Sequence, residues 1–493
     1  MVGCFFLYCR RLGCHSNFHL LCQVTSMTTL HQSVKNSLST KNLRSYAEKI
    51  KLGKILGIFI LLILAVIPSV NYFRKVAIFN IGGTNITIGF LILTAILAFS
   101  FILVLLGRLS YIPKLFILIL LFVLWGTSVA IAQSVPIRWW LPPLLRWTGN
   151  LLIAILGYQF ALKGYLTPRW FRAGLLVSLI APLIMGVSEA SLGLAPLLNN
   201  AYRVSSTFNE SPLGYALFLS GVILLLLSAE KITMLYGMLL VLSLLMVIST
   251  YARLTLVALG VGIVFVLFFQ RRFKMVFLLG LLILPFFLFT PSITEQIVER
   301  FSGLSLTGTD FLNIWREGQI MAYSQKWWRP DIDSSSLLRV KTLIIGLDFW
   351  KQSPIQGSGF GSFVPSYETA TGQANVGAHN DYLLYLMETG IVGLILYIII
   401  QIRIILGLLK KIKFLSEKTR LFVVSTAGAY LTVNILSFLS NSYYFYEIQL
   451  WIWLGIGMSF ALTNLDLQSI PTHNRLRVRK ICQISGSSDR LSG

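Results

Sequence analysis

Charged residues are scarce in this sequence, and their scarcity excludes an ordinary soluble protein. Asp, Glu, Lys and Arg make up 12% of the 493 residues, against the roughly 25% that is usual in soluble domains. Hydrophobic residues make up 56%, and the mean hydropathy is +0.76. This composition predicts an integral membrane protein.

Cysteine is also scarce, and none of the five cysteines occurs between residues 23 and 481. The body of the chain therefore contains neither a disulfide framework nor a cysteine-based metal site. The histidines near the N-terminal cysteines match no standard zinc-finger spacing, so we expect no metal there. Residues 1–26 make a poor signal peptide because their apolar runs are short and interrupted. We interpret them as an upstream extension, with Met27 as an alternative start.

Acidic residues are outnumbered by basic ones, 18 against 41, which gives a formal net charge of +23. In a soluble protein this excess would suggest a nucleic-acid partner. Here the Lys and Arg residues fall in short gaps between apolar runs, a distribution typical of membrane-topology signals. The sequence has no basic domain with interleaved aromatic residues, so we expect no nucleic-acid binding.

Apolar runs long enough to cross a bilayer recur along the chain, since a spanning helix needs about 20 residues. The twelve runs extend over approximately 54–72, 87–107, 114–133, 143–162, 171–188, 213–229, 232–250, 252–269, 274–290, 381–406, 421–440 and 444–463. They predict an all-α, polytopic membrane helix bundle of about 12 transmembrane helices. The run at 143–162 is the weakest, because Arg146 lies near its start. The runs at 232–250 and 252–269 are nearly contiguous, which predicts a tight helical hairpin.

Lys and Arg are concentrated in alternate gaps between the runs, and this asymmetry predicts the orientation. Both ends of the chain are therefore expected in the cytoplasm. The predicted organisation is an N-terminal tail at 1–50, nine transmembrane helices at 51–290, an extracytoplasmic loop at 291–380, three transmembrane helices at 381–464 and a basic cytoplasmic tail at 465–493.

The long loop is the one sizeable polar segment within the membrane region. Its four tryptophans suit a position at the level of the lipid headgroups. Apolar residues recur in it at helical spacing, with three charged residues off that stripe: Leu337, Val340, Ile344 and Leu347 against Arg339, Lys341 and Asp348. The pattern predicts an amphipathic helix that lies on the membrane or caps the bundle.

His379 is the only histidine between His31 and His473, and it directly precedes a long apolar helix. Asn380 or Asp381 is a natural N-cap for that helix. The positive end of the helix dipole disfavours imidazolium and attracts anions. A neutral imidazole here could accept a proton beside a phosphate site. The alternative is a histidine that only forms hydrogen bonds at a membrane interface.

Three arginines are candidates for binding phosphate oxygens. Arg253 starts a predicted helix, Arg339 lies on the loop helix, and Arg203 lies in the outer loop before the sixth run. A guanidinium group binds phosphate through paired hydrogen bonds and keeps its charge, which suits a diphosphate leaving group. The alternative for each is a side chain that extends to the membrane interface without contacting a substrate.

Glu388 lies about two turns into the helix that follows His379, where an ionisable side chain is expected to be functional or paired. The spacing puts Glu388 nearly opposite His379 on the helix, so we do not assign it as the partner of that histidine. A structural ion pair is the favoured interpretation. The glycine-rich turn at 353–363 follows no strand of an α/β unit, so we assign it no nucleotide. Asp331-Ile-Asp333 is too weak a match to assign a metal-bound sugar nucleotide.

The order of these segments resembles the O-antigen ligase and polymerase superfamily of bacterial envelope proteins. The matching segments are S-T-Y-A-R at 249–253, Arg339 ahead of S-P-I-Q-G-S-G-F-G-S-F at 353–363, and H-N-D-Y-L-x-x-L-x-E-x-G-I-V-G-L at 379–394. The likeness is specific from about 340 to 400 and moderate from 200 to 260. At 207–214 this chain has T-F-N-E-S-P-L-G, which departs from the family's Asn-Pro-Asn-containing loop.

The resemblance implies an inverting, metal-independent glycosyltransferase that needs no cofactor. It implies a multi-pass protein of the bacterial inner membrane, with its active site facing the periplasm and membrane lipids around it. The donor would be a polyprenyl-diphosphate-linked oligosaccharide, and the acceptor a lipid A core in ligases or another lipid-linked glycan in polymerases.

The resemblance also implies roles for individual residues. By motif, His379 would orient or deprotonate the acceptor hydroxyl, while Arg253 and Arg339 would neutralise the departing diphosphate. Arg203, Asn380 and Glu388 are further candidates for substrate binding. Two other hypotheses stay open, a small-solute or bicarbonate transporter and a non-catalytic partner in envelope assembly. Against transport, intramembrane charge is sparse and no pair of broken helices occurs in matched halves.

Overall fold

The structure is a computed structural model, and it describes most of the chain. The described residues are 40–70, 77–81, 84–87, single positions between 91 and 102, 113–192, 204–208, 211–250, 252–272, 308–324, 334–374, 376–440 and 445–469. The chain divides into two compact units, Met1–Gly57 and Ile58–Gly493. In the first, the described residues form the beginning of helix α3, and the second contains all of the features below.

The described part of the chain is almost entirely helical. Its α-helices are α3 (Thr40–Val70), α5 (Lys114–Ala132), α6 (Ile137–Leu162), α7 (Pro168–Ser191), α9 (Pro212–Leu226), α10 (Met234–Ser249), α11 (Arg253–Gln270), α14 (Gly308–Met321), α15 (Ser334–Gln352), α16 (Phe363–Thr371), α17 (Asp381–Leu409), α18 (Glu417–Leu439) and α19 (Tyr446–Ser469). Two 3-10 turns, η2 (Ser206–Phe208) and η3 (Ile412–Phe414), complete them.

Seven helices in the described residues are long and apolar enough to cross a membrane, namely α3, α5, α7, α11, α17, α18 and α19. They identify a multi-pass membrane protein. Ten of the twelve predicted runs coincide with helices. The run at 274–290 lies outside the described residues, as does most of 87–107, so the count of about twelve remains a prediction.

One short hairpin departs from the all-α prediction. Strand β1 (Ala77–Ile81) pairs antiparallel with β2 (Thr84–Thr87). The sequence between them is Gly82-Gly83, a dipeptide typical of two-residue hairpin loops. The hairpin was therefore identifiable from a local turn signal in the sequence.

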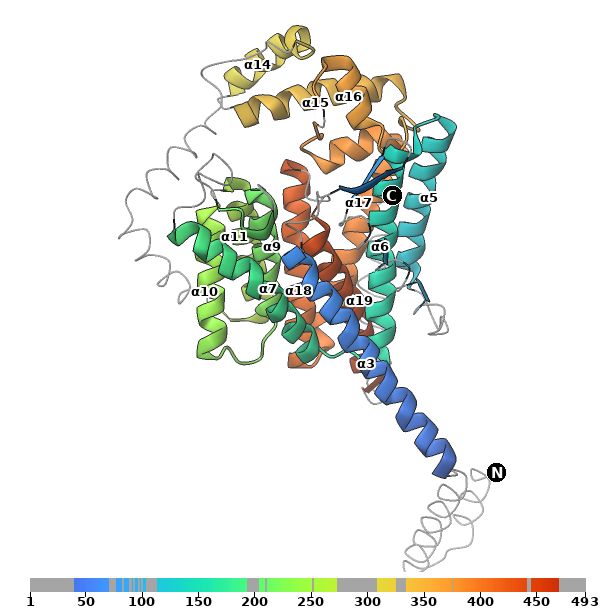
Figure 1. Cartoon of the computed structure of the whole chain (residues 1–493), viewed down its shortest axis with the longest axis vertical. Coiled ribbons are helices and arrows are strands. Elements are labelled where there is room, and N and C mark those ends of the chain that lie inside the picture. The colour runs from blue at the N-terminus through green and yellow to red at the C-terminus, as the bar shows by residue number, and fades with distance from the viewer. Residues whose placement is uncertain are drawn as a thin grey trace, which may run out of the picture. The chain divides into compact units, whose positions relative to one another are not determined.

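Helices α18, α19 and α9 form the core of the bundle. In Figure 1, α18 and α19 lie between the green helices α7 to α11 and the cyan helices α5 and α6. Every residue of α9 from Gly214 to Leu226 is buried, as expected for a helix that is apolar on all sides. Helix α19 packs along α6, where the rings of Trp147 and Trp453 lie 6.2 Å apart.

Contacts between helix ends define the two ends of the bundle. Gln270, at the end of α11, donates through Nε2 to the carbonyl oxygen of Leu421 near the start of α18, at 3.2 Å. Tyr382, at the start of α17, has its ring 5.6 Å from that of Phe438 near the end of α18. Since α11 ends beside the start of α18, α11 starts at the same end of the bundle as the end of α18, where α17 also starts. We call this end the His379 end. The other, with Gln270 and Leu421, we call the basic end.

Lys and Arg residues collect at the basic end. They include Arg169, Arg172, Lys231, Arg271, Arg272, Lys410, Lys411, Lys413, Lys418 and Arg420. These residues come from the gaps that are predicted to be cytoplasmic, so the fold brings the topology signals of separate gaps together. The gap between α10 and α11 lies at the His379 end and is as short as predicted. The two helices nevertheless do not form a tight hairpin, because α10 packs mainly on α9, and α11 on α18.

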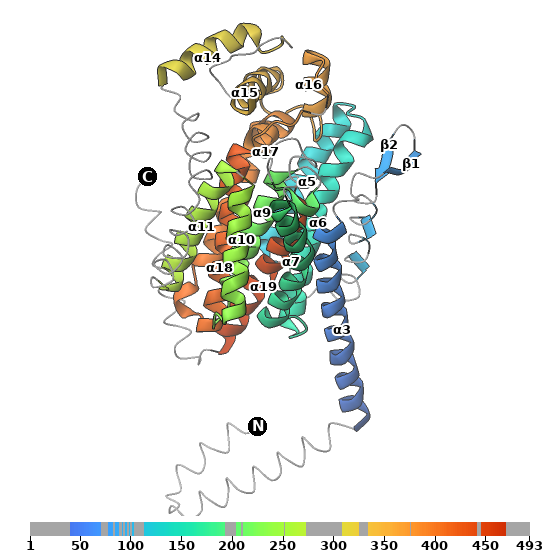
Figure 2. The same ribbon diagram turned by 60° about the vertical axis from the view of Figure 1, so that its left-hand side comes forward.

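Helices α14, α15 and α16 cover the His379 end (Figure 2). They pack on one another and on α17 through a buried apolar cluster that includes Ile314, Leu337, Ile344, Tyr367 and Met387. The helix predicted around 337–347 is confirmed as α15, but it is not strongly amphipathic. Its apolar stripe faces other helices, so of the two predicted placements the structure favours a cap on the bundle.

Lys341 departs from its predicted place on the polar face of this helix. The residue is only 4% exposed. Its Nζ donates to the carbonyl oxygen of Ser324 at 3.0 Å and to Oε1 of Gln373 at 3.5 Å. Burial lowers the pKa of Lys341. The reason is that Ser324, just after α14, and Gln373, just after α16, lie against this lysine, which a single-helix pattern does not reveal.

Candidate functional site

The site is organised around the first turn of α17. The side chain of Asn380 caps this helix, since its Oδ1 accepts a hydrogen bond from the N–H of Leu383 at 3.0 Å. This confirms the predicted cap and selects Asn380 over Asp381. Asp381 is instead the first helical residue and is fully buried, and an acidic residue in the first turn suits the positive end of the helix dipole.

His379 precedes this cap in a conformation that few side chains adopt. Its φ of 54° is left-handed, which costs about 1 kcal/mol for a residue other than glycine. Such strain is typical of functional positions. The side chain is half-buried. Burial lowers the pKa of His379, and the nearby charge of Arg339 lowers it further, so the imidazole is neutral at neutral pH.

Arg339 reaches His379 because α15 caps the bundle. The two residues are 40 positions apart in the sequence, yet the guanidinium lies close enough for its charge to act on the imidazole. Arg339 lies on the half-buried face of α15, one residue before Val340 of the buried cluster. The structure therefore brings together two of the residues singled out in the sequence.

Arg253 is the first residue of α11 and is half-buried at the same His379 end. Arg203 lies outside the described residues, as does the Asp331-Ile-Asp333 motif. The described chain resumes at Val204, whose N–H donates to the carbonyl oxygen of Ser249 at 3.3 Å. This bond ties the segment before α9 to the end of α10, four residues ahead of Arg253.

The glycine-rich turn packs against a break in α17. The helix is interrupted at Gly390, whose φ of 67° is left-handed. Four main-chain hydrogen bonds join the turn to both sides of the break: Ser358 N–H to Met387 O (3.0 Å), Gly359 N–H to Glu388 O (2.7 Å), Ile391 N–H to Pro354 O (2.9 Å) and Val392 N–H to Ile355 O (3.4 Å). Trp125 Nε1 donates to Thr389 O at 2.9 Å. The polar groups freed by the break are thus paired inside the protein, as a membrane requires.

Close backbone packing explains the glycines of this turn. Gly357 has a φ of 76°, and a Cβ on it would lie 2.6 Å from the carbonyl carbon of Glu388. A Cβ on Gly390 would in turn collide with the carbonyl group of Ile355. The turn therefore has a structural use.

Glu388 has main-chain partners in place of the ion pair expected from the sequence. Its side chain is buried, with 3% exposed. Oε1 accepts a hydrogen bond from the N–H of Phe363 at 3.3 Å, and the N–H of Gly361 also donates to the carboxyl group. Within the described residues, Glu388 thus anchors the start of α16 to α17.

Glu189 is a further buried carboxyl group, which was not singled out from the sequence. It lies near the end of α7, is 3% exposed, and accepts hydrogen bonds from the N–H groups of Ser205 at 3.0 Å and Ser206 at 2.6 Å. These residues immediately follow Arg203 and Val204 in the chain. The available signal was an acidic residue directly after the apolar run at 171–188.

The arrangement combines a neutral proton acceptor, permanent positive charge and a helix N-terminus at one end of the bundle. Residues 238–398 match the model of the O-antigen ligase family. The matched range contains Arg253, Arg339, His379 and Glu388 together with the glycine-rich turn. No curated protein matches the chain.

Proposed function

Since residues 238–398 match the O-antigen ligase family, which supports membership in that superfamily, we propose that the chain is a membrane glycosyltransferase of surface polysaccharide synthesis. The donor is a glycan linked to a polyprenyl diphosphate. The acceptor is a hydroxyl group on a lipid A core or on a growing glycan. Nothing observed supports the transporter hypothesis.

The reaction proposed is a single displacement at the anomeric carbon. The acceptor oxygen forms a bond to that carbon while its proton passes to the imidazole of His379. The bond between the anomeric carbon and the phosphate oxygen breaks, and its electron pair leaves with the diphosphate. Because the acceptor attacks the face opposite the leaving group, the configuration at the carbon is inverted.

The observation that carries this proposal is the environment of His379. Its pKa is lowered by burial and by Arg339, so the neutral imidazole needed for proton transfer is the main form at neutral pH. The left-handed backbone at His379 places the residue outside the helix and directly before its cap. The proposed place of the anion is the N-terminus of this helix, whose positive end favours negative charge.

Arg339 and Arg253 supply permanent positive charge for the departing diphosphate. Guanidinium groups bind phosphate oxygens through paired hydrogen bonds, and stabilising charge as it develops is commonly the largest contribution to catalysis. The proposed reaction therefore needs no metal ion, and the rate should be unchanged by EDTA. Asn380 holds the turn that presents His379, while Arg203 is proposed as a further contact to the donor.

The His379 end is proposed to face the periplasm across the inner membrane. The support for this is the collection of Lys and Arg at the opposite end of the bundle, which the positive-inside rule assigns to the cytoplasm. A cysteine introduced near His379 should then react with a membrane-impermeant thiol reagent added outside the inner membrane.

The test is complementation of a deletion strain with the wild-type chain and the His379→Asn variant, followed by electrophoresis of surface polysaccharide. Restoration by the wild type alone supports the proposal, and equal restoration by both contradicts it. The gel also separates the two acceptor classes. A deletion that leaves one attached repeat indicates a polymerase, while a deletion that removes all attached repeats indicates a ligase.

A further inference from the structure

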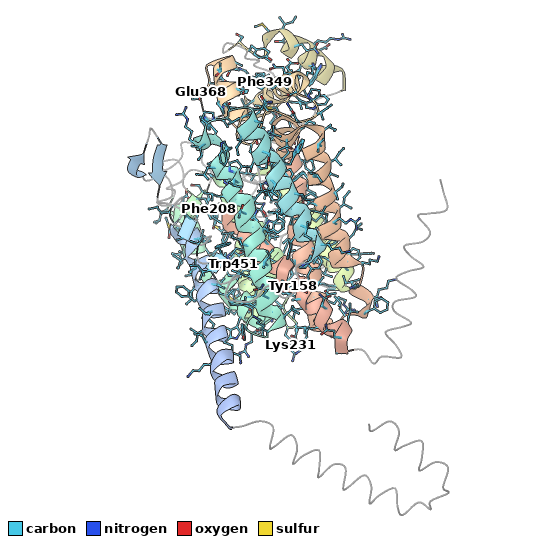
Figure 3. All side chains as sticks on the ribbon, turned by 90° about the vertical axis from the view of Figure 1, so that its right-hand side faces the viewer. Tyr158, Phe208, Lys231, Phe349, Glu368 and Trp451 are labelled. Carbon is cyan, nitrogen blue, oxygen red and sulfur yellow. The ribbon has the colours of Figure 1, made fainter. Side chains whose placement is uncertain are left out.

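A cavity lies at the basic end of the bundle, away from the proposed site. Its volume is about 580 Å³, and its lining includes Arg169, Arg172, Leu176, Glu230, Lys231 and Tyr236. Figure 3 shows Lys231 at the end of the bundle opposite Phe349 and Glu368 of the capping helices. Gln270 confirms this location, because its Nε2 bonds to the carbonyl oxygens of both Leu227 and Leu421.

The cavity carries a net positive charge. Two arginines and one lysine line it, against a single carboxylate, that of Glu230. Glu230 already forms an ion pair with Lys418, with Oε2 and Nζ 3.3 Å apart. Its charge is therefore balanced from outside the lining. Arg169, Arg172 and Lys231 are left to determine the potential within.

Helix ends add to this potential. Helices α7 and α10 both begin at the cavity, capped by Thr167 and Thr233, and the start of a helix is its positive end. Helix α9 ends there, which would oppose an anion. However, Arg172 donates to Ser228 O at 3.3 Å, and Arg272 donates to the carbonyl oxygens of Ala229 and Glu230 at 2.8 and 3.0 Å.

Those bonds lie in the segment that directly follows α9, so two arginine charges stand beside the negative end of this helix and oppose its dipole. The bond to Ser228 also uses only part of the hydrogen-bonding capacity of Arg172, since a guanidinium group has five N–H donors. The first turns of two helices and three cationic side chains thus line one cavity, together with Tyr236. This combination is suited to a phosphate group, which accepts hydrogen bonds through several oxygens.

Apolar surface continues from the cavity along the two helices that begin there. Val177 and Ile180 of α7 are 46% and 55% exposed, and Leu235 and Met238 of α10 are 65% and 59% exposed. In a membrane such side chains face acyl chains. A phosphate in the cavity could therefore be attached to a lipid whose tails lie against these helices.

We propose that this cavity is a binding site for an anionic phosphate group, carried either by a phospholipid headgroup or by a soluble phosphate. The site is separate from the glycosyl-transfer centre and does not depend on the function assigned to that centre. The lining charges and the two helix N-termini would be its recognition elements.

The experiment measures the melting temperature of the full-length protein in neutral detergent with three probes: phosphatidylglycerol, phosphatidylcholine and inorganic phosphate at matched ionic strength. The cavity variant is Arg169→Gln/Lys231→Gln, two exposed side chains whose loss should not disturb the fold. The matched control is Lys410→Gln/Lys413→Gln, which removes the same charge at the same end outside the cavity. Glu230→Gln is a third variant, which should strengthen binding.

A rise of about 2 °C or more with phosphatidylglycerol alone, absent in the cavity variant and retained in the control, supports a lipid source. The same pattern with inorganic phosphate supports a soluble source. A larger response in Glu230→Gln supports either one. The proposal is overturned if the cavity variant responds like the wild type, or if the control loses the response to the same extent.

Discussion

The two ends of the bundle use arginine in different ways. At the basic end, Arg172 and Arg272 donate hydrogen bonds to the carbonyl groups of Ser228 and Ala229, just after the end of α9. At the His379 end, the charge of Arg339 acts on a titratable imidazole and lowers its pKa. The role of an arginine at a membrane boundary therefore depends on the group that it contacts.

The comparison also separates two kinds of positive site. The basic end offers charge and helix N-termini without an imidazole among the residues that line its cavity. The His379 end adds a proton acceptor in a strained backbone conformation. Binding of an anion is therefore within the capacity of both ends, whereas proton transfer is proposed for the His379 end only. Four substitutions test this difference.

His379→Asn should have the largest effect. Asparagine tolerates a left-handed backbone, so the variant should fold, while glycosyl transfer falls about 10²- to 10⁴-fold with the loss of a general base. Initial rates with a lipid-linked donor would measure the fall, and thermal unfolding would confirm the fold. Lys410→Gln, at the basic end, should retain the wild-type rate. An unchanged rate in His379→Asn would remove this residue from the mechanism.

Arg339→Gln should reduce the maximal rate by about 10²-fold, as expected for the loss of one charge-stabilising group. It should also shift the pH dependence. The positive charge disfavours imidazolium, so its removal raises the pKa of His379. Because the neutral imidazole is the proposed base, the rise of rate with pH should move to higher pH. Arg403→Gln, an exposed position in the second half of α17, should leave the profile in place; an equal shift there would contradict a local effect.

Gly390→Ala should destabilise the His379 end by about 2 kcal/mol or more, because a Cβ would meet the backbone of the turn in a left-handed conformation. The melting temperature in detergent would show the loss. The comparison variant is Gly260→Ala in α11, where a Cβ would meet no heavy atom within 4 Å. It should be neutral or slightly stabilising, since alanine favours helix by about 1 kcal/mol. Equal losses in both would indicate a general intolerance of α-helical glycine replacement.

Lys341→Met should have the smallest effect, on the pH dependence of stability. Burial lowers the pKa of Lys341 in the folded state below its ordinary 10.5, so the unfolded chain binds this proton more tightly. The wild type should therefore gain stability as pH rises toward 10.5. In Lys341→Met, the melting temperature should therefore rise less steeply with pH than in the wild type. Lys231→Met, an exposed lysine at the basic end, should keep the wild-type slope; identical slopes for all three proteins would contradict the prediction.

The local features of the His379 end could be predicted from the sequence. The cap at Asn380 follows from residue type at the start of an apolar run, and α15 follows from its apolar spacing. The helices agree with the apolar runs because burial in a bilayer imposes both their length and their composition. These features depend on neighbours within a few residues of one another.

The features that the sequence analysis missed depend on distant partners. Glu388 was expected to pair with a basic side chain, but its hydrogen bonds come from main-chain N–H groups about 25 residues upstream, which have no side-chain signature. Lys341 is buried by neighbouring helices of the cap. The break at Gly390 was missed because the residues after it continue an apolar helical pattern without interruption.

The break in α17 also fixes the number of residues between His379 and Gly390. Eleven positions separate His379 from Gly390 (390 − 379), and the bonds of the glycine-rich turn hold the residues on either side of Gly390 in one register. Each residue added to a helix turns everything before it by about 100°. A single insertion or deletion between Tyr382 and Met387 would therefore swing the imidazole away from Arg339 while leaving both residues in the chain. The segment between His379 and Gly390 should therefore tolerate most changes of side chain better than a change in its length.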